Sequence, residues 1–373
     1  MPHISAQFDS GNIEVVDASD PANIRLRIRD DVGGEHKQWF HFRMVGARDV
    51  DCRLHIENAG QCSYPAAWDG YQAVASTDRD EWFRVPTSYD ASTGTLTIEV
   101  TPLVDALWFA YFAPYSREQH HDLVAGCQAA GATLTVLGQT LDGEDLEQLS
   151  IGNGPLPIWV IARQHPGESM AEWWMEGFLG RLMDPDDALA RTLLERATFH
   201  VVPNMNPDGS RRGHLRTNAA GANLNREWQE PTLERSPEVK LVRDAMDATG
   251  VKLCLDVHGD EELPYNFISG AEGTPSWTPE RDAVLRAFEA AYEAANPDFQ
   301  TEKGYPTAAP GKANMTMCTN QTSERYGALG MTLEMPFKDN ANLPDELYGW
   351  SPERCRQLGA SVLHPMAAVL DRL

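Results

Sequence analysis

The sequence predicts an α/β domain that follows a smaller all-β domain, and two patterns along the chain predict this division. Up to residue 115, short runs alternate apolar and polar residues, which is typical of half-buried strands in an antiparallel sandwich. From residue 116 onward, strand-like and helix-like segments alternate, which is typical of a mixed, mostly parallel sheet flanked by helices. We therefore expect a β-sandwich domain at 1–115 and an α/β domain at 116–373.

The strands of the first domain are predicted from period-two apolar runs with turn residues between them. The runs begin at Ile24, Phe40, Leu54 and Leu96. A continuous apolar segment at 107–115 predicts a buried last strand before the second domain.

The second domain is predicted from five apolar strand candidates and three similar helix starts. The candidate strands are 134–137, 158–162, 199–203, 252–257 and 331–335. A hydroxyl residue precedes a Pro-Glu pair at three positions, Ser236, Thr278 and Ser351. The hydroxyl indicates an N-cap, the proline the first helical position, and the glutamate a negative charge that the helix dipole favours. Gly250 is the expected C-cap of the first of these helices.

Composition restricts the classes of partner. The chain has 373 residues and a formal net charge of −24, so its overall field disfavours nucleic acid and anionic membranes. The N-terminus has no secretory pattern, and no apolar run is long enough to span a bilayer. The six cysteines lack CxxC spacing, which predicts reduced thiols in a cytoplasmic protein, with a Cys52–Cys62 disulfide as the alternative.

Three residues at strand ends form a candidate metal site. His165 and Glu168 follow the strand candidate 158–162, and His258 ends the strand candidate 252–257. Ligands of α/β sheets gather at the carboxyl ends of strands, and two histidines with one glutamate leave the fourth zinc position open for catalysis. Asp256 could orient a ligand from behind. The alternatives are a chance His-x-x-Glu pair and a histidine bonded only to backbone.

The segment 204–228 concentrates positive charge in an acidic chain. Arg211, Arg212, Arg216 and Arg226 fall within 16 residues, mixed with Asn, Gly and apolar residues. Arginine binds carboxylates in a bidentate manner, so this composition favours a pocket lining over the alternative of a solvated loop.

Five motifs in order resemble those of the zinc metallocarboxypeptidase family. They are His165-x-x-Glu168, Asn206-Pro-Asp-Gly209, Asn225-Arg226, His258 and Thr332-Leu-Glu334. The β-rich N-terminal region, with Trp39-Phe-His-Phe42 and Tyr111-Phe-Ala-Pro-Tyr115, is similar to the cytosolic carboxypeptidase subfamily.

The resemblance implies a role for each matched position and one zinc ion per chain. His165, Glu168 and His258 would bind the zinc ion. Glu334 would be the general base, with a strand-end carboxylate paired to Lys338 or an arginine as the alternative. Arg216 would stabilise the oxyanion, and Asn225 and Arg226 would bind the terminal carboxylate of a peptide or protein substrate.

Substrate preference and the family's active-site tyrosine are less determined by the sequence. The cytosolic subfamily implies removal of C-terminal acidic residues such as glutamate. Arg211, Arg212 and Lys312 are candidates for the cationic pocket, with plain surface charge as the alternative. Tyr305 and Tyr326 precede Glu334, but neither has the expected spacing, and both fit a core or rim position.

Two other functions remain open at this point. One is a small-molecule N-acyl amino acid amidohydrolase resembling aspartoacylase and succinylglutamate desuccinylase, which share the zinc motifs. The other is a catalytically inactive binding module, which the intact ligand set and Glu334 argue against.

Overall fold

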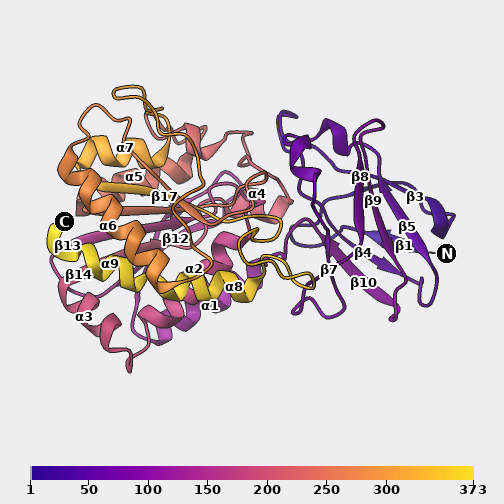
Figure 1. Cartoon of the computed structure of the whole chain (residues 1–373), viewed down its shortest axis with the longest axis horizontal. Coiled ribbons are helices and arrows are strands. Elements are labelled where there is room, and N and C mark those ends of the chain that lie inside the picture. The colour runs from indigo at the N-terminus through magenta and orange to yellow at the C-terminus, as the bar shows by residue number, and fades with distance from the viewer. Residues whose placement is uncertain (1) are drawn as a thin grey trace.

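The computed structural model describes residues 2–373 and shows two lobes side by side (Figure 1). The N-terminal lobe contains only strands and short turns of helix, and the larger lobe contains a sheet covered by helices. The two chain termini lie at opposite ends of the molecule. Among the described residues, no helix combines the length and apolar character needed to cross a membrane.

The N-terminal lobe is a sandwich of two five-stranded sheets, with strand orders β1-β4-β10-β6-β7 and β2-β3-β5-β9-β8. The strands are β1 (His3–Ser5), β2 (Glu14–Asp17), β3 (Ile24–Arg27), β4 (His41–Val45), β5 (Cys52–Ile56), β6 (Val74–Ser76), β7 (Phe83–Arg84), β8 (Thr87–Asp90), β9 (Thr95–Val100) and β10 (Ala106–Ala110). Alternate residues of β3, β5 and β9 are buried and share one core with residues of the other sheet, which confirms the predicted pattern.

Two details of this lobe differ from the expectation. β3 and β5 pair in parallel, because the chain crosses to the other sheet to form β4 between them. The last strand ends at Ala110 rather than at Tyr115. Residues 111–115 are buried as a connection that packs against the second lobe, so they leave the sheet although they are apolar.

The second lobe is organised around a seven-stranded mixed sheet with the order β11-β12-β14-β13-β15-β17-β16. The strands are β11 (Thr133–Gln139), β12 (Asp145–Ile151), β13 (Leu156–Ala162), β14 (Ala197–Val202), β15 (Leu253–Val257), β16 (Phe267–Gly270) and β17 (Leu329–Glu334). The four central strands run parallel, and antiparallel strands complete both edges. All five predicted strands are present, which confirms the α/β class.

Helices flank this sheet on both sides (Figure 1). They are α1 (Arg117–Ala129), α2 (Met170–Leu182), α3 (Ala188–Arg196), α4 (Pro207–Arg212), α5 (Pro237–Thr249), α6 (Pro279–Ala295), α7 (Cys318–Tyr326), α8 (Pro352–Ser361) and α9 (Leu363–Val369). The predicted N-caps at Thr278 and Ser351 accept hydrogen bonds from the third residue of their helices, and Gly250 ends α5 at a positive φ. Ser236 precedes α5 without a side-chain cap.

The two lobes are joined by buried contacts. The ring of Tyr111 stacks on Phe337 with centroids 4.5 Å apart. The guanidinium of Arg84 in the N-terminal lobe donates to the carbonyl oxygens of Phe337, at 2.9 Å, and Trp350, at 3.2 Å. β10 ends at Ala110 and α1 begins at Arg117, so the boundary expected after residue 115 falls within this connection.

Candidate functional site

Three neighbouring parallel strands bring the predicted ligands to one edge of the sheet. β13 pairs with β15, and β15 pairs with β17, so the carboxyl ends of these strands lie side by side. His165 and Glu168 follow β13, His258 follows β15, and Glu334 is the last residue of β17. The site therefore lies at the carboxyl edge of the parallel strands, where α/β sheets place their ligands.

The three expected ligands converge in the described structure. Nδ1 of His165 lies 2.7 Å from Oε1 of Glu168, and Nδ1 of His258 lies 2.8 Å from its Oε2. One ligand atom from each residue lies within 4.8 Å of the other two, and all three side chains are buried. Two imidazole nitrogens and a carboxylate at this spacing suit a zinc ion with an open coordination position.

Polar side chains contact the Nε2 atoms of the two histidine ligands and orient their rings. Nε2 of His165 lies 3.0 Å from Oδ1 of Asn223, and Nε2 of His258 lies 2.9 Å from Oδ2 of Asp256. With a metal bound, donation of Nε2–H to these oxygens would leave the Nδ1 lone pairs free to bind it beside Glu168. Gln164 donates to the same Asp256 oxygen at 2.6 Å. Asp256 thus makes the contact expected from its place on β15, whereas Asn223 was not foreseen.

Burial and the neighbouring charges shift the pKa values of all three ligands. Burial lowers the pKa of His165 to about 3, so its imidazole is neutral. Burial also opposes protonation of His258, but Asp256 and Glu168 outweigh it and raise its pKa well above the usual value. Burial raises the pKa of Glu168, and the two histidines outweigh it and lower that pKa. A divalent cation competes with protons for such a group of ligands.

A sharp turn carries His165 and Glu168. Arg163 has φ +58°, a left-handed conformation that costs a non-glycine residue about 1–2 kcal/mol. Gly167 approaches the neighbouring loop so closely that a Cβ would lie 2.9 Å from the carbonyl oxygen of Leu215. The amide of Gly167 donates to that same oxygen at 2.9 Å, which links the ligand turn to the arginine-rich segment.

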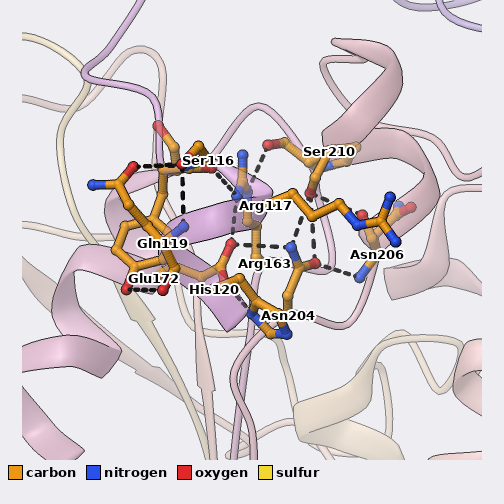
Figure 2. Close-up of polar contacts among 12 residues, drawn as sticks. Ser116, Arg117, Gln119, His120, Arg163, Glu172, Asn204, Asn206 and Ser210 are labelled. Atoms are coloured by element: carbon orange, nitrogen blue, oxygen red, sulfur yellow. Dashed lines mark hydrogen bonds and ion pairs between the residues drawn. The ribbon is translucent and has the colours of Figure 1, made fainter. Parts of the chain in front are cut away.

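A buried polar network joins this turn to α2 (Figure 2). Arg163 pairs with Glu172 of α2 and donates to the carbonyl oxygen of Pro166 at 2.9 Å. The carboxylate of Glu172 also accepts from Asn204, at 3.0 Å, and contacts Nδ1 of His120, at 2.7 Å. Each buried charge of the network has a partner, which avoids the cost of an unpaired buried charge.

Glu334 has a buried oxygen without a partner. Its Oε2 accepts no hydrogen bond from any described residue, and the side chain is 7% exposed. Burial raises its pKa well above the usual value, and nearby Glu168 adds to this shift while His258 opposes it. The alternative pairing with Lys338 is wrong, because the ammonium of Lys338 donates to the carbonyl oxygen of Asp69 at 2.7 Å.

Arg216 approaches the ligands from the loop after α4. The charges of Tyr64, Glu261, Glu168 and Glu334 together outweigh burial and raise the pKa of this arginine. Its guanidinium carbon lies 5.6 Å from the ring centroid of Tyr64, which belongs to the N-terminal lobe. No pattern in the sequence indicates Tyr64, because its place at the site depends on how the lobes dock.

Asn225 and Arg226 lie on a short 3-10 turn, Leu224–Arg226. Oδ1 of Asn225 accepts from the amide of Cys318 at 2.9 Å, so its NH₂ group is directed for donation elsewhere. Nη1 of Arg226 donates to the carbonyl oxygen of Asn225 at 2.6 Å. Burial and the charge of Arg216 lower the pKa of Arg226, so the two cations lie near each other.

Arg211 lies in different surroundings from those expected. It pairs with Asp142, at 3.0 Å, and Glu144, at 3.3 Å, and Arg212 pairs with Asp142 at 2.7 Å. Both arginines belong to α4 and face the connection between β11 and β12. This placement speaks against the substrate-binding role expected for Arg211, because its charge is already neutralised there. Arg211 lines a cavity of about 250 Å³, and none of the three metal ligands lines that cavity.

The two candidate tyrosines lie in different parts of the second lobe. Tyr305 lines a cavity of about 490 Å³ together with Thr332, and its hydroxyl donates to Asp260. Burial and the charge of Glu334 raise the pKa of Tyr305, so it lies near the proposed base. The hydroxyl of Tyr326 instead donates to Asp247 at 2.8 Å, at the end of α7.

Comparison with known proteins finds carboxypeptidases. Residues 4–112 match the model of the cytosolic carboxypeptidase N-terminal domain, and residues 121–352 match that of zinc carboxypeptidase. A metallo-carboxypeptidase from Burkholderia cenocepacia is 47% identical, with a TM-score of 0.97 and full coverage of both chains. A metallo-carboxypeptidase from Pseudomonas aeruginosa, solved with (2-guanidinoethylmercapto)succinic acid, is 48% identical over 99% of both chains, with a TM-score of 0.96.

A longer relative is also similar. Cytosolic carboxypeptidase 1 of Xenopus laevis is 29% identical over 358 residues, which cover 81% of this chain. The match spans only 28% of the Xenopus protein, so most of that protein has no counterpart in the alignment.

Proposed function

We propose that this chain, which belongs to the zinc carboxypeptidase family, hydrolyses the last peptide bond of peptides or proteins. The observation that carries the proposal is the convergence of His165, Glu168 and His258 beside the unpaired carboxyl oxygen of Glu334. One zinc ion per chain, held by these three ligands, would polarise the scissile carbonyl and lower the pKa of water.

The other side chains have complementary roles in this reaction. Glu334 takes a proton from the attacking water and delivers it to the amine that leaves when the C–N bond breaks. Arg216 stabilises the negative charge that develops on the carbonyl oxygen. Asn225 and Arg226 bind the terminal carboxylate, which restricts cleavage to chain ends.

The cavity of about 490 Å³ beside Thr332 is the proposed place for the terminal side chain. Glu272 and Glu289 line it, but both pair with Arg286. Lys303 and Lys312 also line it, and neither makes an ion pair with a described residue. The lining as a whole has three acidic side chains, Glu272, Glu289 and Glu302, and three basic ones, Arg286, Lys303 and Lys312, so its net charge is zero. The two lysines without ion-pair partners would pair with an acidic end such as glutamate, which is the preference we propose.

The expected compartment is the cytoplasm. All six cysteines lie among the described residues, and each is buried and unpaired. Cys52 and Cys62 therefore do not form the alternative disulfide. Unpaired thiols are typical of a reducing compartment.

A library of peptides varied at the last two positions tests the proposal. We expect the release of single C-terminal residues, fastest for glutamate, followed by mass spectrometry and abolished by a chelator. Peptides ending in arginine and leucine are the matched comparison, and N-acyl amino acids test the amidohydrolase alternative. Cleavage of N-acyl amino acids without cleavage of any peptide would contradict the proposal.

A further inference from the structure

One carboxylate of the N-terminal lobe binds the loop that carries Arg216. Oδ1 of Asp31 accepts from the amide of Leu215 at 2.7 Å. Oδ2 accepts from the amides of Arg216, at 2.8 Å, and Thr217, at 3.0 Å, and from the Thr217 hydroxyl at 3.1 Å. Asp31 is 3% exposed, so these bonds are shielded from water.

Backbone hydrogen bonds hold Asp31 in place for its contact with the loop. Asp31 is held in its own turn, where its amide donates to the carbonyl oxygen of His36 at 2.8 Å and its carbonyl oxygen accepts from Gly34 at 3.0 Å. Hydrogen bonds from successive amides to an ionised carboxylate are stronger than bonds between neutral groups. Because the loop 213–217 lies outside the helices and strands, its own backbone supplies little order.

The same loop is fixed on two further sides. Asn12, also from the N-terminal lobe, donates to the carbonyl oxygen of Gly213 at 2.8 Å. Gly167 of the ligand turn donates to the carbonyl oxygen of Leu215 at 2.9 Å. The backbone of Arg216 is therefore held between the N-terminal lobe and the turn that carries His165 and Glu168.

We propose that Asp31 is a positioning residue for Arg216, so that the N-terminal lobe completes the site. The inference rests on the proposed function, in which Arg216 stabilises charge on the scissile carbonyl oxygen. Asp31 touches no reacting atom, and it acts by fixing the backbone from which the guanidinium extends. The ring of Tyr64, from the same lobe, bounds the guanidinium at 5.6 Å. The lobe thus sets both the origin of the Arg216 side chain and one wall of the space it occupies.

Replacing Asp31 with asparagine tests this role. In Asp31→Asn, the NH₂ group faces backbone amides that also donate, so the loop loses at least one bond and the carboxylate charge. We expect kcat for peptide cleavage to fall about 10- to 100-fold, with KM changed less than about 3-fold, because small displacements of a charge-stabilising group act mainly on the transition state. The bound zinc content is expected to stay unchanged.

Two controls separate positioning from general destabilisation. Asp30→Asn changes the neighbouring exposed acid, which pairs with Lys37 at 2.7 Å, and is expected to behave as wild type. In an Arg216→Ala background, Asp31→Asn is expected to change kcat less than about 2-fold, because its effect passes through Arg216. Additive losses in the double variant would overturn the proposal.

Hydrogen exchange supplies a readout that needs no activity. We expect the amides of Leu215, Arg216 and Thr217 to exchange faster in Asp31→Asn than in Asp30→Asn or wild type. Thr217→Val removes only the hydroxyl donor and serves if Asp31→Asn does not fold, with a smaller effect in the same direction. Unchanged exchange, or faster exchange with unchanged kcat, would refute the role of Asp31. A wild-type chain without peptidase activity would instead refute the proposed function, and the exchange experiment would still decide whether Asp31 orders the loop.

Discussion

At the residue scale, the buried carboxyl of Glu334 combines an oxygen without a hydrogen-bond partner with a place beside the metal ligands. A buried polar atom without a partner costs about 1–3 kcal/mol, and Oε2 of Glu334 is one of seven such side-chain atoms among the described residues. Glu168, Asp260 and Glu261 add negative charge nearby, which raises the pKa of Glu334 further. A carboxyl in such a place is well suited to exchange a proton with water at the ligand edge.

The variant Glu334→Gln tests the role of this residue. It preserves size and removes the basic oxygen, so we expect kcat to fall about 10²- to 10⁴-fold. Zinc content and the free energy of unfolding are expected to change little, because a neutral amide is no costlier to bury than a carboxylate. Steady-state peptide cleavage and metal analysis measure both. Glu262→Gln, at an exposed acid nearby, is the control, and activity of Glu334→Gln within 3-fold of wild type would contradict the assignment.

Residues on or beside strands could be placed from the apolar periodicity of the sequence, whereas loop residues have no such pattern and depended on the resemblance to a family. His258 and Glu334 end apolar strands, so their meeting follows from the parallel sheet. Arg211 cannot be separated from Arg216 by residue type, because arginine occurs both on α4 and in the loop after it, and only the fold places Arg211 against Asp142. Asn223 and Asp31 reach the site from segments with no periodic pattern.

At the element scale, four elements meet behind the ligand turn. α1 contributes His120, β12 contributes Glu147, α2 contributes Glu172, and Asn204 follows β14. His120 lies between Glu172, at 2.7 Å, and Glu147, at 3.1 Å. β12 escaped prediction because polar residues such as Gln148, which is 5% exposed, occupy buried positions of the strand and hide its apolar alternation.

His120 gives the stability of the chain a pH dependence. Burial lowers its pKa, but Glu147 and Glu172 outweigh burial and raise that pKa to about 9 from 6.5. The folded protein therefore binds this proton more tightly than the unfolded chain. The resulting stabilisation is fully present below pH 6.5 and is lost as pH rises through about 9.

Chemical unfolding between pH 6 and 10 measures this effect in wild type and in His120→Gln. We expect the free energy of unfolding of wild type to fall by about 3 kcal/mol more than that of the variant over this range. His121→Gln alters the exposed neighbour and is expected to keep the wild-type slope. Parallel curves for wild type and His120→Gln would show that the histidine is not charged in the folded state.

At the scale of the whole molecule, the site lies where the two lobes meet. Tyr64 and Asp31 come from the N-terminal lobe, and the ligands come from the sheet of the larger lobe. Both fold classes could be predicted from periodicity, because each lobe has its own apolar pattern. The docking of the lobes could not be predicted, since it depends on single contacts such as Tyr111 on Phe337.

Removal of the metal tests the coupling between site and fold. A zinc ion that binds only the folded chain stabilises it by several kcal/mol, so a chelator is expected to lower Tm by several degrees in calorimetry, and added zinc to restore it. Because Arg84 and Tyr111 join the lobes through buried contacts, we expect one transition that moves as a unit. In Glu168→Gln, which weakens the ligand set, the chelator is expected to have little effect. Two separate transitions, of which only one responds to the chelator, would show that the lobes unfold independently. An unchanged Tm in wild type would argue against a zinc ion at His165, Glu168 and His258.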